Sequence, residues 1–157
     1  MNSRERFLTT INRKEPDRPP IIATVTPQVA EKLSKSLDLQ YEPPYDSMLS
    51  TRMSHMDLLT HLGNDAAGVA ACAADESPTE VMESGLMRNE WGMTMKDIGL
   101  YGEFYDYPLR HAETKPDIDN YPFPYPYANG RFRVAKQNIA KYKPDYGVGM
   151  ISAPSRA

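Results

Sequence analysis

The chain has 157 residues, a length typical of one domain, and its 40% hydrophobic content is sufficient for a folded core. Charges of both signs are mixed along it to a formal net charge of -3, without the basic stripe that binds nucleic acid, so we expect no nucleic-acid partner. A single cysteine, Cys72, excludes an internal disulfide, and the sequence shows neither a signal peptide nor a membrane span. We therefore expect a cytoplasmic protein.

The amino-terminal third predicts a helix, a strand and a second helix. Ser3 can cap a short helix that ends before the proline-rich run at 14–20. Residues 20–25 then form a short apolar, β-branched run, typical of a strand buried on both faces of a parallel sheet. Thr26 and the proline after it favour the start of a helix over 27–37.

A longer helix is expected next, over residues 46–62. Asp46 can cap it, Gly63 can close it, and its apolar residues recur at spacings of three and four. The small residues of 65–71 predict a second strand, of a kind that suits a crowded barrel interior.

The middle of the chain predicts a β-hairpin over 86–105. Lys96-Asp97-Ile98-Gly99 is placed like its turn, and Trp91, Met93 and Met95 alternate with polar residues in the first arm. An extended, proline-stiffened segment follows as far as Tyr127.

Residues 132–142 carry an apolar stripe at helical spacing, and Pro144 should end that helix. Residues 146–151 are the third candidate strand. Since parallel neighbours require crossover connections, this alternation of strands and helices predicts an α/β fold with strands 20–25, 65–71 and 146–151 parallel in one sheet.

Several segments resemble the amino-terminal part of the uroporphyrinogen decarboxylase superfamily, which includes corrinoid-dependent methyltransferases. They are, in chain order, SRERFLTTINRKEPDRPPII, LGNDAAGVAA, NEWGM with Tyr101 and the dipeptide Pro108-Leu109, and DIDNYPFP before the helix near GRF.

The resemblance implies an incomplete (β/α)8 TIM barrel, since a complete one takes roughly 250 residues. Residues 1–157 would be the amino-terminal part of a single barrel domain, with a helical extension at 1–18 and a hairpin and proline-rich insertion at 86–127. With edges of the sheet left open, the chain alone is expected to associate with itself.

The resemblance also implies two activities for the parent protein: decarboxylation of a tetrapyrrole in porphyrin biosynthesis, or methyl transfer with a corrinoid protein as partner. Residues 22–28 lack the arginines with which the decarboxylases grip substrate carboxylates, which favours methyl transfer. The methyltransferases bind zinc through residues late in the barrel, so this chain is expected to hold no cofactor although the parent would use zinc and a corrinoid. The alternative is a truncated, non-catalytic remnant with at most a binding role.

Four residues are candidates for a site that binds a small-molecule substrate. Asp75 occupies a place loosely similar to that of the family's catalytic aspartate, while Thr24, Glu90 and Trp91 are candidates for substrate binding. A tryptophan beside a carboxylate on a hairpin could close over a flat ligand, although structural packing explains the same pair.

The other reactive side chains have ordinary interpretations. Cys72 among alanines is typical of a small buried hydrophobe. His55 and His61 are six residues apart, a spacing that does not place two metal ligands on one helix face, and His111 is isolated. Asp117 and Asp119 are more typical of a capped turn than of a calcium loop.

Overall fold

The computed structural model describes residues 1–99 and 102–150, which form a mixed α/β protein with two small sheets. The chain divides into two compact units: unit 1 comprises residues 1–72 and the chain from 132 onward, and unit 2 comprises residues 73–131. Neither sheet closes into a barrel within the described residues.

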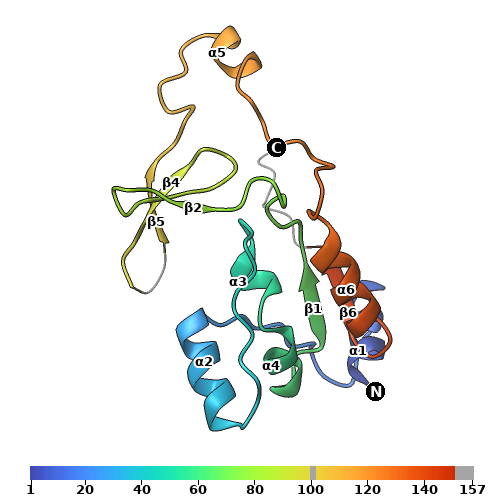
Figure 1. The fold of residues 1–157 in the computed structure, drawn as a ribbon. Helices are drawn as coiled ribbons and strands as arrows, with labels where there is room; N and C mark the ends of the chain where they lie inside the picture. Colours follow the sequence, from blue (N-terminus) through green and yellow to red (C-terminus); the bar gives the residue numbers. More distant parts are fainter. Residues whose placement is uncertain (100–101, 151–157) are drawn as a thin grey trace. The chain divides into compact units, whose positions relative to one another are not determined.

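Unit 1 contains five helices and two parallel strands among its described residues (Figure 1). They are, in chain order, α1 (Ser3–Ile11), α2 (Pro27–Ser36), α3 (Ser50–Met53), α4 (Met56–His61), β1 (Ala66–Val69), α6 (Arg133–Tyr142) and β6 (Gly147–Met150). The helices at 27–37 and 132–142 and the strands at 65–71 and 146–151 are thereby confirmed within a few residues at their ends; Ile151 lies outside the described residues.

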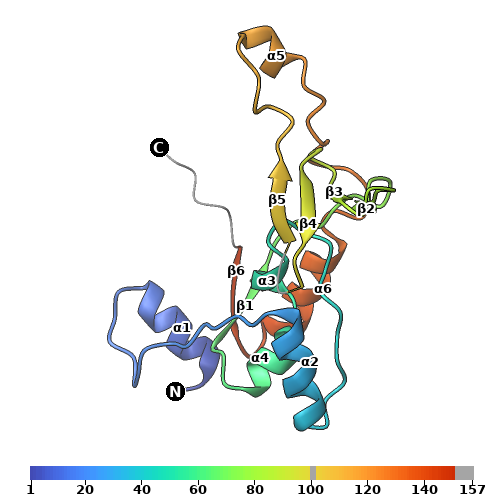
Figure 2. The same cartoon turned by 90° about the vertical axis from the view of Figure 1, so that its left-hand side faces the viewer.

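The parallel pair is the centre of unit 1. Ala66 pairs with Gly147, and the register continues to Val69 opposite Met150. Figure 2 shows the two strands side by side, with α1 next to them. A core of Met56, Leu59, Ala67 and Tyr142, with Val148 against it, fixes α4 and α6 on one face of the pair.

Helix α1 begins one residue earlier than the sequence predicted. Asn2, and not Ser3, is its cap: the Asn2 side chain accepts from Glu5 N at 2.8 Å, and the Glu5 carboxylate accepts from Asn2 N at 2.9 Å. This reciprocal pair of hydrogen bonds satisfies two amide donors. With Ser3 as the cap, the Glu5 carboxylate would not be placed to accept from the amide of the cap residue.

The predicted strand at 20–25 is wrong, because this segment is coil. Its backbone is held beside the start of β1 mainly by side chains: Ile21 N donates to the Asp65 carboxylate at 2.8 Å, and the Asn64 amide exchanges two hydrogen bonds with Ala23 at 2.9 and 3.1 Å. The only backbone bond of this contact runs from Asp65 N to Ile21 O at 2.8 Å. Hydrogen bonds to polar side chains thus take the place of most of the backbone hydrogen bonds that a paired strand would make.

The predicted continuous helix over 46–62 is wrong as well. It is broken between α3 and α4, where His55 takes a left-handed conformation with φ 61°. At the break the Ser54 backbone is extended, and its hydroxyl accepts from Tyr45 N at 3.0 Å. The predicted apolar stripe is confirmed in part, since Met53, Met56 and Leu59 are buried whereas Leu62 is 49% exposed.

Unit 2 is built on an antiparallel sheet in the order β2-β3-β4-β5. Its elements are β2 (Glu80–Val81), β3 (Met87–Arg88), β4 (Thr94–Asp97), β5 (Gly102–Asp106) and the short helix α5 (Lys115–Asp119). The predicted hairpin is confirmed as β4 and β5, which lie next to each other in Figure 2.

Three details of unit 2 differ from the sequence prediction. Lys96 and Asp97 belong to β4 and not to the turn, and Trp91 lies in the turn before β4 and not in its arm. The segment that was predicted to be extended contains α5, which a capping box of Thr114 and Asp117 begins. Asp117 therefore caps a turn, as predicted, and its carboxylate accepts from the Thr114 amide.

Tyr101, which belongs to the second arm of the predicted hairpin, lies outside the described residues.

Candidate functional site

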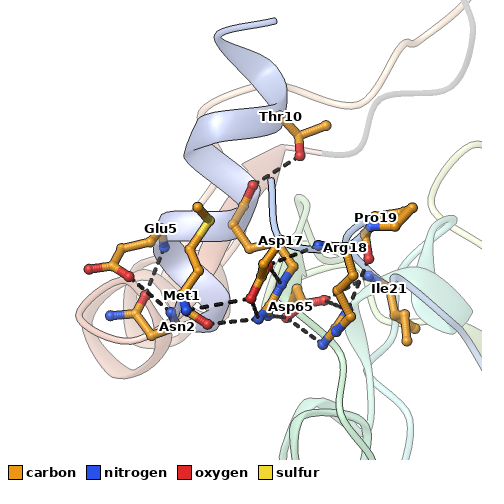
Figure 3. Close-up of polar contacts among 10 residues, drawn as sticks. Met1, Asn2, Glu5, Thr10, Asp17, Arg18, Pro19, Ile21 and Asp65 are labelled. Carbon is orange, nitrogen blue, oxygen red and sulfur yellow. Dashed lines mark hydrogen bonds and ion pairs between the residues drawn. The ribbon is translucent and has the colours of Figure 1, made fainter. Parts of the chain in front are cut away.

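A buried cluster of charges lies at the amino end of β1. Asp65 is fully buried and accepts from Arg6 Nη1 at 2.6 Å and from Arg18 Nη1 at 2.7 Å. Arg6 also donates to both carboxylate oxygens of Asp17, from Nε at 2.7 Å and from Nη2 at 2.9 Å. Figure 3 shows Asp17 and Arg18, from the loop after α1, next to Asp65, which directly precedes β1.

The charges of this cluster are fixed. Burial opposes ionisation of Asp65, but hydrogen bonds led by the Ile21 amide and Arg18 prevail and lower its pKa to about 2. The hydrogen bonds from Arg6 hold the pKa of Asp17 below its usual range and raise the pKa of Arg6 itself. Groups that stay charged throughout the neutral range cannot shuttle protons, so the cluster fastens α1 and its loop to the sheet.

The opposite, carboxyl end of the parallel pair is where α/β folds place their chemistry. After β1 ends, the Ser47 hydroxyl donates to Ala71 O at 2.7 Å, and Cys72 follows half-buried. Burial, and next the charge of Asp46, raise the pKa of the Cys72 thiol. Cys72 is therefore a protonated thiol at neutral pH and a poor nucleophile.

A second group of titratable side chains joins α4 to α6. The Asp57 carboxylate accepts from Lys141 Nζ at 2.5 Å and from Tyr142 Oη at 2.7 Å, and it lies beside the Glu42 carboxyl. Burial and the charge of Asp57 raise the pKa of Glu42, whereas the hydrogen bonds from Lys141 and Tyr142 outweigh burial and lower the pKa of Asp57. Two neighbouring carboxyls with pKa values pushed apart are able to hold one proton between them.

This group was missed by sequence reasoning. Asp57 and Tyr142 are 85 residues apart, and no local spacing relates them. Burial, and next the hydrogen bond to Asp57, raise the pKa of Tyr142 above its ordinary value. The phenol is thus a fixed donor, and it ties the two helices together as well as shaping the carboxyl pair.

His55 lies close to this group and is buried, with 3% of its surface exposed. Its ring is stacked on Tyr41 with centroids 5.8 Å apart. Burial lowers the pKa of His55, although a backbone contact with Glu42 partly opposes the shift. His55 is therefore a neutral ring at pH 7, in a backbone conformation that His adopts more readily than most residues.

Glu90 is bound to an arginine inside unit 2. Its two carboxylate oxygens accept from Arg131 Nη1 and Nη2, each at 2.6 Å, and both side chains are only 7% exposed. Arg131 Nε also donates to Tyr125 O at 3.1 Å. Such a two-fold, desolvated ion pair orders its loop strongly, and it leaves the Glu90 carboxylate committed to a protein partner.

Trp91, next to Glu90, is 37% exposed in a turn. The Asn89 side chain accepts from Trp91 N at 3.0 Å and from Met93 N at 3.1 Å, and Tyr121 Oη donates to Trp91 O at 2.5 Å. The backbone on both sides of the ring is therefore fixed while part of the ring reaches solvent. This is the geometry of a rigid aromatic contact surface.

The two remaining candidates lie in different units. Asp75 N donates to Asn129 O at 3.0 Å, and the Asp75 carboxylate covers Gly130, where a Cβ would overlap with it. Asp75, Glu90 and Trp91 thus belong to unit 2, with the segment 129–131 contacting the first two. Thr24 is an exposed residue of unit 1, in the coil before α2.

The chain matches no protein-family model, no curated protein and no solved structure. None of the helices formed by residues 1–99 and 102–150 combines the length and apolar character needed to cross a membrane.

Proposed function

We propose that the chain is the amino-terminal part of a (β/α)8 barrel enzyme of the uroporphyrinogen decarboxylase type, whose parent protein transfers a methyl group carried by a corrinoid. The observation that supports it most is the parallel pairing of β1 with β6. Parallel neighbours need a crossover, and here α6 precedes β6 and packs with β1 and β6, as a barrel helix does.

The two faces of the parallel pair differ in the way that a barrel wall requires. Ala66, Gly68, Gly147 and Gly149 share one face by register, whereas Ala67 and Val148 on the other face pack against the helices. The small residues of the first face leave room there for side chains from further strands, except at Gly147, against which Phe7 of α1 lies. The fastening of α1 at the amino end of β1 agrees with this, because the amino-terminal face of a barrel serves stability.

Methyl transfer is preferred to decarboxylation because three of the chain's arginines are already paired with carboxylates. Arg6 and Arg18 are bound to Asp17 and Asp65, and Arg131 is bound to Glu90. A tetrapyrrole with several carboxylates needs cationic groups that are available to it. Residues 22–28 contain no arginine.

The described residues do not fit the zinc site that such a methyltransferase would use. Zinc is bound by thiolate, imidazole or carboxylate groups in sets of three or four, and within 1–99 and 102–150 no group of three such side chains is arranged to hold a metal. Cys72 retains its proton through burial. We therefore assign no zinc-dependent step to this chain, and expect that alone it neither decarboxylates uroporphyrinogen nor transfers a methyl group.

The test begins with the nucleotide sequence beyond the codon for Ala157. An open frame that continues with a His-x-Cys pair and a later cysteine supports the methyltransferase, and the product of that frame should demethylate methylcobalamin with a thiol acceptor. A product that instead decarboxylates uroporphyrinogen would refute the methyltransferase while keeping the barrel. A stop codon at this point in all isolates, or turnover by the 157-residue chain itself, would contradict the proposal as a whole.

A further inference from the structure

A groove of unit 1 runs between α1 and α6 over the parallel strands. Its volume is about 340 Å³, and its apolar lining comes from Phe7, Leu8 and Ile11 of α1, Ile139 of α6 and Val148 of β6. Ile11 and Ile139 are 58% and 38% exposed, so the groove leaves large aliphatic side chains in contact with water.

The charged residues that line the groove are all cations. Arg4 of α1 and Lys143 after α6 stand on its two sides, and both also border a smaller adjoining hollow beside Ala140 and Pro144. Among the described residues that line either space there is no carboxylate. An apolar floor with cations from both walls complements a ligand that is apolar along its length and anionic at one end.

We propose that this groove binds an anionic amphiphile, namely an unbranched aliphatic carboxylate of about eight to twelve carbons. The aliphatic chain lies on Ile139, Leu8 and Val148, and the carboxylate is paired with Arg4 and Lys143. The inference does not rest on the function proposed above.

The size of the groove decides between a small ligand and a protein segment. Small-molecule sites span about 300–1,000 Å³, and this groove, at about 340 Å³, lies at the lower end. A docked helix is about 10 Å across with a pitch of about 5.4 Å, so one of its turns already exceeds a volume of about 340 Å³. A single aliphatic chain fits better, and a carboxylate can remain at the solvent-facing rim, where its hydration is partly kept.

The binding experiment is calorimetric titration of the whole chain with decanoate below its micelle concentration. We expect a Kd on the order of 100 µM, as is usual for a ligand with few heavy atoms. Decyltrimethylammonium, of equal chain length and opposite charge, should bind at least about tenfold more weakly, and added salt should weaken decanoate binding.

Variants locate the site. Arg4→Ala together with Lys143→Ala should weaken decanoate binding about five- to tenfold. Lys136→Ala changes an exposed lysine of α6 that does not line the groove, and it should not weaken binding. Ile139→Trp should abolish binding because the indole fills the groove. Ile139 is partly exposed, so this variant should keep the circular dichroism spectrum of the parent chain.

Three results would overturn the proposal. They are equal affinity for decanoate and decyltrimethylammonium, undiminished decanoate binding by the Ile139→Trp variant, and no binding at about 1 mM. Sedimentation covers the remaining occupant: if Ile139→Trp converts a dimer to a monomer and decanoate fails to bind, the groove is covered by a second copy of the chain and the ligand proposal is wrong.

Discussion

Replacing Asp65 with asparagine tests whether the charge cluster holds unit 1 together. The carboxylate is 0% exposed, and it accepts hydrogen bonds from Arg6, Arg18 and the Ile21 amide. Asparagine has nearly the same shape, so the change removes a charge without opening a cavity. One carboxylate oxygen becomes an amide NH₂, which faces donors that it cannot satisfy.

The structure sets the size of the effect. Removing one partner of a buried ion pair costs about 3–5 kcal/mol because the other charge is left buried and unpaired. Here Arg6 keeps Asp17 through bonds of 2.7 and 2.9 Å, and Arg18 is 42% exposed, so neither guanidinium is stranded completely. We therefore expect Asp65→Asn to lower the free energy of unfolding of unit 1 by about 3 kcal/mol at pH 7, the lower end of that range.

The assay is urea unfolding monitored by hydrogen exchange at the amides of β1. The control is Asp145→Asn, which changes an exposed aspartate of the same unit. The pKa of Asp65 is lowered to about 2, so its contribution is present above the unfolded pKa of about 3.9 and is lost as the pH falls towards 2. The difference between parent and variant should shrink over that interval. A loss below about 1 kcal/mol at pH 7, or one that does not change with pH, would refute the reasoning.

Three further changes test other contacts. Gly147→Ala places a Cβ within the ring of Phe7, so we expect a loss of about 1–3 kcal/mol by urea unfolding, and a smaller loss when Phe7→Leu is present as well; strict additivity would contradict the contact. Glu90→Gln leaves Arg131 buried with a neutral partner and should destabilise unit 2 by about 3 kcal/mol, measured by the fluorescence of the chain's single tryptophan; an unchanged midpoint would show that the pair adds nothing. Burial lowers the pKa of His55, so the unfolded chain takes up the proton first as the pH falls below about 6.5, and stability should fall from pH 7 to pH 5. His55→Asn should remove this dependence of stability on pH; a dependence that persists in the variant would mean that other groups cause it.

The elements that the sequence predicted correctly are those whose reasons are local. Helices α2 and α6 carry apolar stripes at helical spacing, and β1 and β6 are short apolar runs between turns. The break at His55 was not visible because neither glycine nor proline marks it. There the Ser54 hydroxyl accepts from the amide of Tyr45, nine residues earlier, a contact that only the folded chain reveals.

The segment at 20–25 failed for a related reason. Its apolar, β-branched composition is typical of a strand, yet a strand needs a neighbour whose backbone is free to pair. The neighbouring chain offers the side chains of Asn64 and Asp65 in that place. Local propensity was overridden by a tertiary contact that lies more than forty residues away in sequence.

The candidate site was less predictable than the fold, because its chemistry depends on distant partners. The pattern around Glu90 suggested a carboxylate beside an exposed ring, but it could not show that Arg131 takes up both oxygens. The pairing of Asp57 with Tyr142 likewise has no signature in sequence. Ion pairs between residues far apart decide whether a carboxylate is available to a ligand, and spacing alone does not reveal them.

The segments on which the resemblance depends supply most of the polar anchors in both units. SRERF contributes Arg6, EPDRPP contributes Asp17 and Arg18, and LGND contributes Asp65, which meet in one cluster. NEWGM and GRF contribute the two halves of the ion pair in unit 2. These segments therefore supply ion pairs that hold the fold together. A resemblance in them is an argument about the fold more than about which substrate is bound. In the barrel enzyme proposed above, the choice between decarboxylation and methyl transfer would depend on residues at the carboxyl ends of strands, where a barrel collects its catalytic groups from several strands at once. That is why the proposed activity is tested on the product of any open frame that continues past Ala157, whereas the anchors are tested on this chain.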